Sequence, residues 1–98
     1  MKFVQIIDYE TEQPDEFKAL GEERRQAAGD ANTATRGMVL RDRDNPNRYY
    51  VVVEFDSYEE AMRNSELPET QKFAEQAAQL CTRPTRFINC DLIDVMET

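Results

Sequence analysis

The stretch YYVVVEF, from Tyr49 to Phe55, places apolar side chains on both faces of a strand. Helices of the same chain can cover one face of the sheet to which such a strand belongs. The other face needs a second layer, for which a chain of 98 residues has little sequence left. The stretch therefore predicts a sheet that is buried between the chain's own helices and a partner subunit.

Size and charge limit the classes of protein and of partner. With 98 residues and 40% hydrophobic content, the chain is predicted to fold as one globular domain spanning residues 1–98. Lys and Arg number 12 against 20 Asp and Glu, which gives a net charge of −8. Because this charge repels nucleic-acid phosphates and anionic lipids, we expect neither a nucleic acid nor a membrane as partner.

The N-terminal stretch and the cysteines predict a cytoplasmic protein. Asp8 interrupts the first apolar stretch too early for a signal peptide, and no apolar run approaches the roughly 20 residues of a membrane span. Cys81 and Cys90 have no metal-like spacing and no histidine to assist them, so we expect two reduced thiols.

Two stretches around the strand have helical signals. Phe17, Leu20 and Arg24 fall on one stripe at helical spacing, in a helix predicted to begin at about residue 15 and to end at residue 29, a glycine. After the strand, Ser57 and Glu60 have the spacing of a capping box, in which each side chain binds the other residue's backbone amide. A helix is therefore expected to follow the strand directly.

The order of the predicted elements decides the fold class. The elements are strands over 3–9, 33–43, 49–55 and 85–96, a helix over 15–28, and a second helix from 57 that breaks at 64–68 and restarts after Pro68. With right-handed crossovers, this is the βαββαβ order of an α+β, ferredoxin-like domain. We expect a four-stranded antiparallel sheet with the first and third strands central and both helices on one face. A two-fold copy of the chain is the expected cover for the other face.

Several kinds of site are made improbable by composition. The chain has no histidine, which removes the usual general base near neutral pH and the nucleophilic pairs that depend on it. Two cysteines cannot close a structural zinc site, and the three glycines are isolated, so no phosphate-binding loop is expected. We therefore predict neither a metal nor a cofactor.

The candidate catalytic residues are polar groups on strands that should be largely buried. Asn89 and Asp91 alternate on the last strand and share a face, Tyr50 lies in the third strand, and Arg36 lies in the second. A buried carboxylate must be paired or have a raised pKa, which suits a base that abstracts a proton. The structural alternative is that Asp91 pairs with Arg36 or Arg86 at the dimer contact, and that Asn89 and Tyr50 serve only in packing.

Three stretches carry a resemblance to a known family. They are the helix entry FDSYEEA (55–61), the helix restart PETQKF (68–73) and the ending PTRFINCDL (84–92). Together with the order of elements, they resemble the dimeric α+β barrel superfamily, which includes antibiotic-biosynthesis-monooxygenase-like domains, and most of all its small uncharacterised actinobacterial members. The resemblance implies a homodimer whose sheets face each other, with a small-molecule pocket between each sheet and its helices.

The resemblance leaves two functional hypotheses. In the first, the protein is a homodimeric small-molecule-binding protein that acts as a cofactor-independent monooxygenase on an aromatic or polyketide-like substrate. Tyr50, Asn89 and Asp91 would position or deprotonate the substrate, and Arg36 would stabilise the developing oxyanion. Catalytic relatives commonly use His or Trp, and this chain has neither. The second hypothesis is therefore a non-catalytic dimeric module that binds a metabolite or another protein.

Overall fold

The apolar stretch from Tyr49 to Phe55 belongs to one of the two central strands. In the computed structural model, which describes residues 1–97, β3 (Arg48–Phe55) pairs antiparallel with β1 (Phe3–Glu10) along its full length. β2 (Ala34–Arg41) and β4 (Arg86–Asp91) lie at the two edges, so the order of the four strands is β2-β3-β1-β4. This confirms the predicted antiparallel, ferredoxin-like sheet with the first and third strands at its centre.

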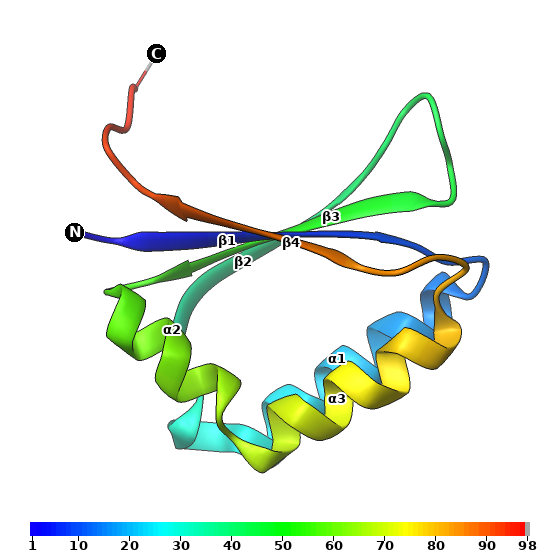
Figure 1. Ribbon diagram of the computed structural model, residues 1–98, viewed down its shortest axis with the longest axis horizontal. Coiled ribbons are helices and arrows are strands. Elements are labelled where there is room, and N and C mark those ends of the chain that lie inside the picture. Colours follow the sequence, from blue (N-terminus) through cyan, green and yellow to red (C-terminus); the bar gives the residue numbers. More distant parts are fainter. Residues whose placement is uncertain (98) are drawn as a thin grey trace.

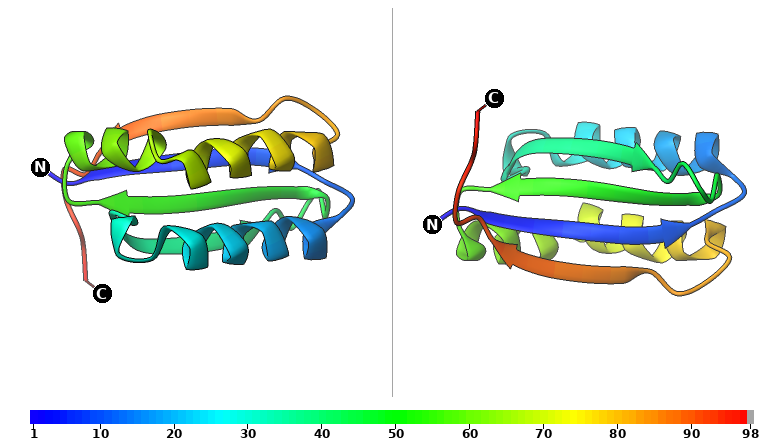
Figure 2. Two further views of the ribbon diagram at one scale, coloured as in Figure 1. Left: turned by 90° about the horizontal axis from the view of Figure 1, so that it is seen from below. Right: turned by 90° about the horizontal axis from the view of Figure 1, so that it is seen from above.

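All helices lie on one side of the sheet (Figures 1 and 2). They are α1 (Pro14–Ala28), with the short turn η1 (Gly29–Ala31) at its end, α2 (Tyr58–Ser65) and α3 (Pro68–Leu80). The predicted break before Pro68 separates α2 from α3. None of the helices within residues 1–97 is long and apolar enough to cross a membrane.

We call the side of the sheet that faces the helices the helix side, and the other side the open side. Phe3 and Tyr9 define the helix side, because Phe3 meets Tyr58 of α2 edge-on with ring centroids 5.4 Å apart, and Tyr9 stacks on Phe17 of α1 at 4.0 Å. Strand alternation then assigns the odd-numbered residues of β1 to the helix side and the even-numbered ones, including Asp8, to the open side.

One part of the core lies where α2 covers the ends of the two central strands. Phe3, Phe55 and Ala61 form its buried cluster, with 3–5% of each residue exposed. The predicted cap at the start of α2 is half confirmed, since Ser57 Oγ accepts a hydrogen bond from the Glu60 amide at 3.1 Å. The reciprocal bond does not form because the Glu60 carboxylate pairs instead with Arg63, at 2.6 Å.

The last strand is shorter than predicted. β4 ends at Asp91 rather than near residue 96. Asp91 lies opposite Phe3, the first residue of β1, and one further backbone bond runs from the Leu92 amide to the Lys2 carbonyl oxygen, at 2.9 Å. The apolar residues that follow lie outside the sheet.

Candidate functional site

The residues predicted from sequence to be catalytic lie on two sides of the sheet. Asn89 and Asp91 are opposite Gln5 and Phe3, which places both on the helix side, as their spacing predicted. Tyr50 is opposite Asp8 on the open side. Arg36 is opposite Glu54, also on the open side. Because Tyr50 and Glu54 are four strand residues apart, Tyr50 and Arg36 are about 13 Å from each other along the sheet. A single chain therefore does not bring the four residues together.

The expected burial of these residues is wrong for three of them. Asn89, Asp91 and Arg36 are exposed, and Tyr50 is half-buried. Asn89 and Asp91 are exposed because they lie on β4, an edge strand, where the helices give less cover than over the centre. Arg36 is exposed because it lies on the open side, which no helix within residues 1–97 covers (Figure 1). Asn89 Oδ1 accepts a hydrogen bond from Gln5 Nε2 at 3.1 Å. Within residues 1–97 of one chain, Asp91 forms no ion pair with an arginine.

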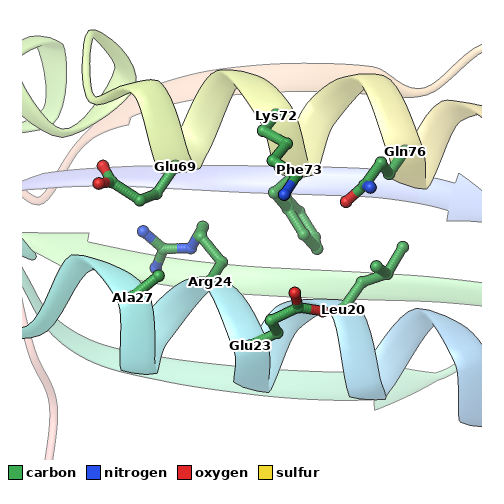
Figure 3. A pocket seen from close by; sticks show the side chains of 8 residues that line it. All are labelled: Leu20, Glu23, Arg24, Ala27, Glu69, Lys72, Phe73 and Gln76. Atoms are coloured by element: carbon green, nitrogen blue, oxygen red, sulfur yellow. The ribbon is translucent and has the colours of Figure 1, made fainter.

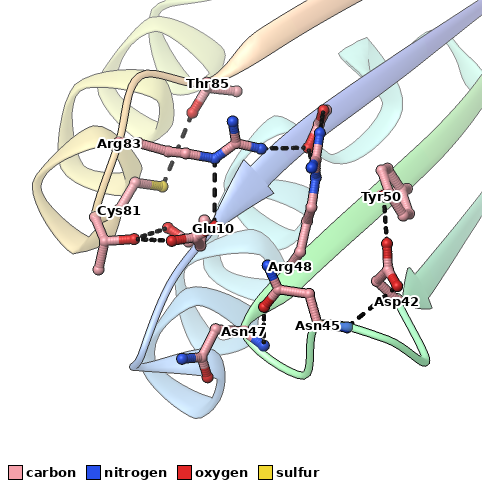
Figure 4. Close-up of polar contacts among 11 residues, drawn as sticks. Glu10, Asp42, Asn45, Asn47, Arg48, Tyr50, Cys81, Arg83 and Thr85 are labelled. Atoms are coloured by element: carbon pink, nitrogen blue, oxygen red, sulfur yellow. Dashed lines mark hydrogen bonds and ion pairs between the residues drawn. The ribbon is translucent and has the colours of Figure 1, made fainter.

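Tyr50 is held by Asp42, a partner that was not predicted from the sequence. Its hydroxyl donates to Asp42 Oδ2 at 2.7 Å (Figure 4). This bond, more than burial, raises the pKa of Tyr50 above its ordinary value of 10.0. The same bond is the main reason that the pKa of Asp42 is lowered from 3.8. Tyr50 is thus fixed as a neutral hydrogen-bond donor and is poorly suited to abstract a proton.

A second missed feature is an ionic cluster on the open side, formed by Asp8, Glu10, Arg48 and Arg83. Arg48 donates to both carboxylate oxygens of Asp8, at 3.0 and 2.6 Å, and Arg83 donates to Asp8 Oδ1 at 3.1 Å. Arg83 Nε also lies 3.5 Å from Glu10 Oε2, without hydrogen-bond geometry (Figure 4).

The ionic cluster stabilises the charged form of Asp8. The hydrogen bonds from Arg48 lower the pKa of Asp8 below its ordinary value of 3.8, although its burial opposes this. An ionised, doubly paired carboxylate is a weak base, so the cluster indicates a structural role for Asp8. The signal for it in the sequence is a single aspartate within the apolar stretch FVQIIDY.

The third polar feature lies at the seam between α1 and α3. A hollow of about 100 Å³ opens there (Figure 3). Its lining comes from one face of each helix: Leu20, Glu23, Arg24 and Ala27 of α1, and Glu69, Lys72, Phe73 and Gln76 of α3. The hollow combines an apolar floor with charged side chains of both signs, as small-ligand sites commonly do.

Arg24 is the unusual member of this lining. Its Nη1 donates to Thr70 Oγ1 at 3.3 Å, and within residues 1–97 it forms no ion pair with a carboxylate. Burial, followed by the like charge of Arg25, lowers the pKa of Arg24, and the charge of Glu69 partly opposes this. An arginine nevertheless keeps its charge at neutral pH. A half-buried cation without a counter-ion can bind an oxyanion or a carbonyl oxygen. The sequence signal was an arginine on the apolar stripe of α1.

Comparison with known proteins extends the fold assignment. No protein family matches the sequence, and no curated protein matches it. Similar solved structures include SnoaB, a cofactor-independent oxygenase from Streptomyces nogalater solved as an asparagine-to-alanine mutant, with a TM-score of 0.83 and 15% identity over 99% of this chain and 98% of that one. Rv0793 from Mycobacterium tuberculosis has a TM-score of 0.80 and 12% identity over 99% of this chain and 100% of that one.

An antibiotic biosynthesis monooxygenase is also similar, with a TM-score of 0.75 and 12% identity over 96% of this chain and 100% of that one. At these identities, the likeness extends to the fold alone. The chain therefore has the ferredoxin-like α+β fold of the antibiotic biosynthesis monooxygenase structures.

Proposed function

We propose that this chain is a cytoplasmic, homodimeric small-molecule-binding protein that acts as a cofactor-independent monooxygenase on an aromatic or polyketide-like substrate. The observation that carries the proposal is Arg24, a half-buried cation that forms no direct ion pair within residues 1–97 and borders a hollow between two helices. A guanidinium in this position would stabilise the oxyanion of a phenol or enol and so favour its deprotonation. The shared fold with a cofactor-independent oxygenase supports the reaction class.

The residues predicted from sequence have separate roles in this proposal. Asn89 and Asp91, on the helix side, would bind and deprotonate the substrate from β4, since neither lines the hollow that Arg24 borders. The amide nitrogen of Asn89 is available for this, because it donates to no residue within 1–97 while its oxygen accepts from Gln5. Tyr50 and Arg36, on the open side, would act only across the contact between two copies, with Tyr50 as a donor rather than as a base.

The first prediction concerns Arg24. Replacing it with methionine, which keeps the length but removes the charge, should weaken binding of a phenolate ligand by about 10- to 100-fold, because a hydrogen bond to a charged group contributes roughly 1.5–3 kcal/mol. Titration calorimetry with an anthrone-type phenol measures the affinity. Arg43→Met is the matched control, since it removes the same charge from an exposed position in the loop between β2 and β3 and should leave the affinity unchanged. Equal losses in the two variants would remove Arg24 from the site.

The reaction itself is tested by oxygen uptake. The chelator-treated protein is mixed with a panel of phenolic and anthrone-type compounds, and oxygen consumption is compared with product formation. The proposal expects equal amounts of oxygen consumed and substrate oxidised, with slower turnover in the Asn89→Ala and Asp91→Asn variants. If both variants kept full turnover, these two residues would not be catalytic.

One observation favours the alternative, a non-catalytic dimeric module that binds a metabolite or another protein. The hollow of about 100 Å³ is smaller than the roughly 300–1,000 Å³ typical of sites for drug-sized ligands. Ligand binding that depends on Arg24 but is accompanied by no oxygen uptake with any compound would establish this alternative.

The homodimer is proposed from the open side of the sheet. Its central positions are apolar, and no helix within residues 1–97 covers them (Figure 1). They are Val4, Ile6, Met38, Leu40, Val52, Ile88 and Cys90. An apolar surface of this extent is typical of an interaction site. A second copy can cover it, with the same residues in contact on both partners.

A charge at the centre of the open side should abolish the dimer. Val52 lies opposite Ile6 on one neighbouring strand and Met38 on the other. Val52→Arg would bury an unpaired charge in the contact, so we expect the dissociation constant to rise by at least about 100-fold. Val52→Ile keeps the surface apolar and should preserve the dimer. Sedimentation velocity distinguishes the two, and a dimeric Val52→Arg variant would show that this side is not the interface.

A further inference from the structure

Two tyrosines lie side by side on the helix side of the sheet, apart from the hollow that Arg24 borders. Tyr9 and Tyr49 are paired across β1 and β3, and their rings stack with centroids 5.4 Å apart and planes 15° from parallel. Phe17 of α1 also stacks on the Tyr9 ring, at 4.0 Å. Two strands and a helix therefore fix these rings in place.

The hydroxyl groups of both tyrosines are free. Neither takes part in a hydrogen bond within residues 1–97. Tyr9 is only 4% exposed, and a buried tyrosine hydroxyl normally has a partner. Within the same residues, Arg83 Nε is the sole side-chain nitrogen or oxygen that is sealed from solvent without a partner, so the Tyr9 hydroxyl is not sealed. Water or a ligand can reach it.

The two hydroxyls are suited to bind one oxygen atom. Burial, followed by the nearby Tyr49 and Cys81, raises the pKa of Tyr9 to about 12, so its hydroxyl keeps its proton at neutral pH. Because the rings are nearly parallel and start from paired positions, the hydroxyls have about the same spacing as the rings. An O–H···O hydrogen bond is about 2.7–2.8 Å long, so an oxygen placed between the two hydroxyls can accept from both. Two such donors favour an oxygen that carries negative charge.

The tyrosine pair lies away from Arg24. Phe17, which stacks on Tyr9, precedes Arg24 by seven residues of α1, which is about 10 Å along the helix axis. Arg24 reaches instead to Thr70 of α3, at 3.3 Å. One ligand oxygen therefore cannot contact both Arg24 and the tyrosine pair.

We propose that Tyr9 and Tyr49 form a second oxygen-binding position, at which both hydroxyls donate to one carbonyl or phenolate oxygen of the ligand. The proposal rests on the proposed function and deepens it. Since Arg24 holds a different oxygen, the ligand is a polycyclic aromatic compound with oxygens on separate rings. Phe73 lines the hollow and meets Phe17 edge-on at 5.8 Å, so the ligand would pack on aromatic rings between the two positions (Figure 3). The hollow of about 100 Å³ would hold only the end near Arg24.

The test is titration calorimetry with 2,6-dihydroxyanthraquinone, which has a hydroxyl at each end of a three-ring system. Tyr9→Phe and Tyr49→Phe each remove one hydroxyl and keep the ring, so each should weaken binding by about 3- to 10-fold, as expected for one hydrogen bond. The double variant should weaken binding by at least about 10-fold. Tyr58→Phe is the matched control, because Tyr58 is 52% exposed on α2 and its hydroxyl should not affect the affinity.

Two further measurements separate this role from a structural one. Donation to the phenolate should make the bound probe ionise at a lower pH than the free probe, which its absorbance spectrum reports, and this shift should shrink in Tyr9→Phe. The urea midpoint of Tyr9→Phe without probe should equal that of the unmodified chain, because the hydroxyl has no partner within residues 1–97.

Three results would overturn the proposal, and they differ. If both tyrosine variants bind the probe as tightly as the unmodified chain while Arg24→Met binds it less tightly, the tyrosine pair is not part of the site and the proposed function stands. If the unmodified chain does not bind the probe, the proposed binding function and the tyrosine position are both wrong. A lower urea midpoint of Tyr9→Phe with unchanged affinity would show that the hydroxyl has only a structural role.

Discussion

Replacing Phe55 with alanine is expected to lower the free energy of unfolding by about 3–5 kcal/mol, the largest loss for any single change considered. Phe55 is 4% exposed at the end of central strand β3, and its ring centroid lies 6.3 Å from that of Phe3. It also belongs to the buried cluster with Ala61, which holds α2 against the sheet. The truncation would leave a cavity where both central strands and α2 meet. A loss of this size is a large share of the roughly 5–15 kcal/mol that stabilises a typical domain.

Urea denaturation at one fixed protein concentration measures this loss, since the stability of a dimer depends on concentration. Phe87→Ala is the matched control, because it removes the same atoms from a ring that is 56% exposed. We expect the control to lose no more than about 1 kcal/mol. Similar losses in the two variants would show that the core does not lie where α2 covers the sheet.

The second large effect is expected from Asp8→Asn, which should lower the free energy of unfolding by about 2 kcal/mol. Asp8 is 3% exposed and is paired with Arg48 and Arg83. Loss of one partner from a fully buried ion pair costs about 3–5 kcal/mol, and the estimate for Asp8 is smaller because the two arginine side chains are partly exposed to solvent. Asp44→Asn removes the same charge from an exposed turn and should change the stability by less than about 0.5 kcal/mol.

The Asp8 variant should also change how stability depends on pH. The folded-state pKa of Asp8 is depressed below 3.8, chiefly by the hydrogen bonds from Arg48. A depressed carboxylate stabilises the folded state fully above its unfolded pKa, and this stabilisation is lost as the pH falls through the folded pKa. Between neutral pH and pH 3, the unmodified chain should therefore lose more stability than Asp8→Asn. The variant should still lose some stability in acid, but less than the unmodified chain, because the pKa of Asp42 is also lowered. Parallel pH profiles in the two proteins would contradict the role given to Asp8.

The candidate site could be predicted only in part. The two-residue spacing of Asn89 and Asp91 correctly predicted that they share a side of the sheet. Their burial was predicted wrongly, because burial depends on which strands form the edges. The partners of Asp8 and Arg24 were missed for a related reason. Arg48 and Thr70 lie 40 and 46 residues further along the chain, and nothing local in the sequence specifies such contacts.

The sequence by itself determined the elements and their order, since these follow from local causes. Apolar alternation specifies the strands, helical spacing specifies the helices, and Gly29, Ser57 and Pro68 mark where helices begin or end. Only the tertiary structure decided that Asn89 and Tyr50 lie on opposite sides of the sheet, that Asp8 meets two arginines, and that Arg24 forms no direct ion pair within residues 1–97. The register between strands and the cover given by each helix decide these contacts, and both depend on residues far apart in the chain.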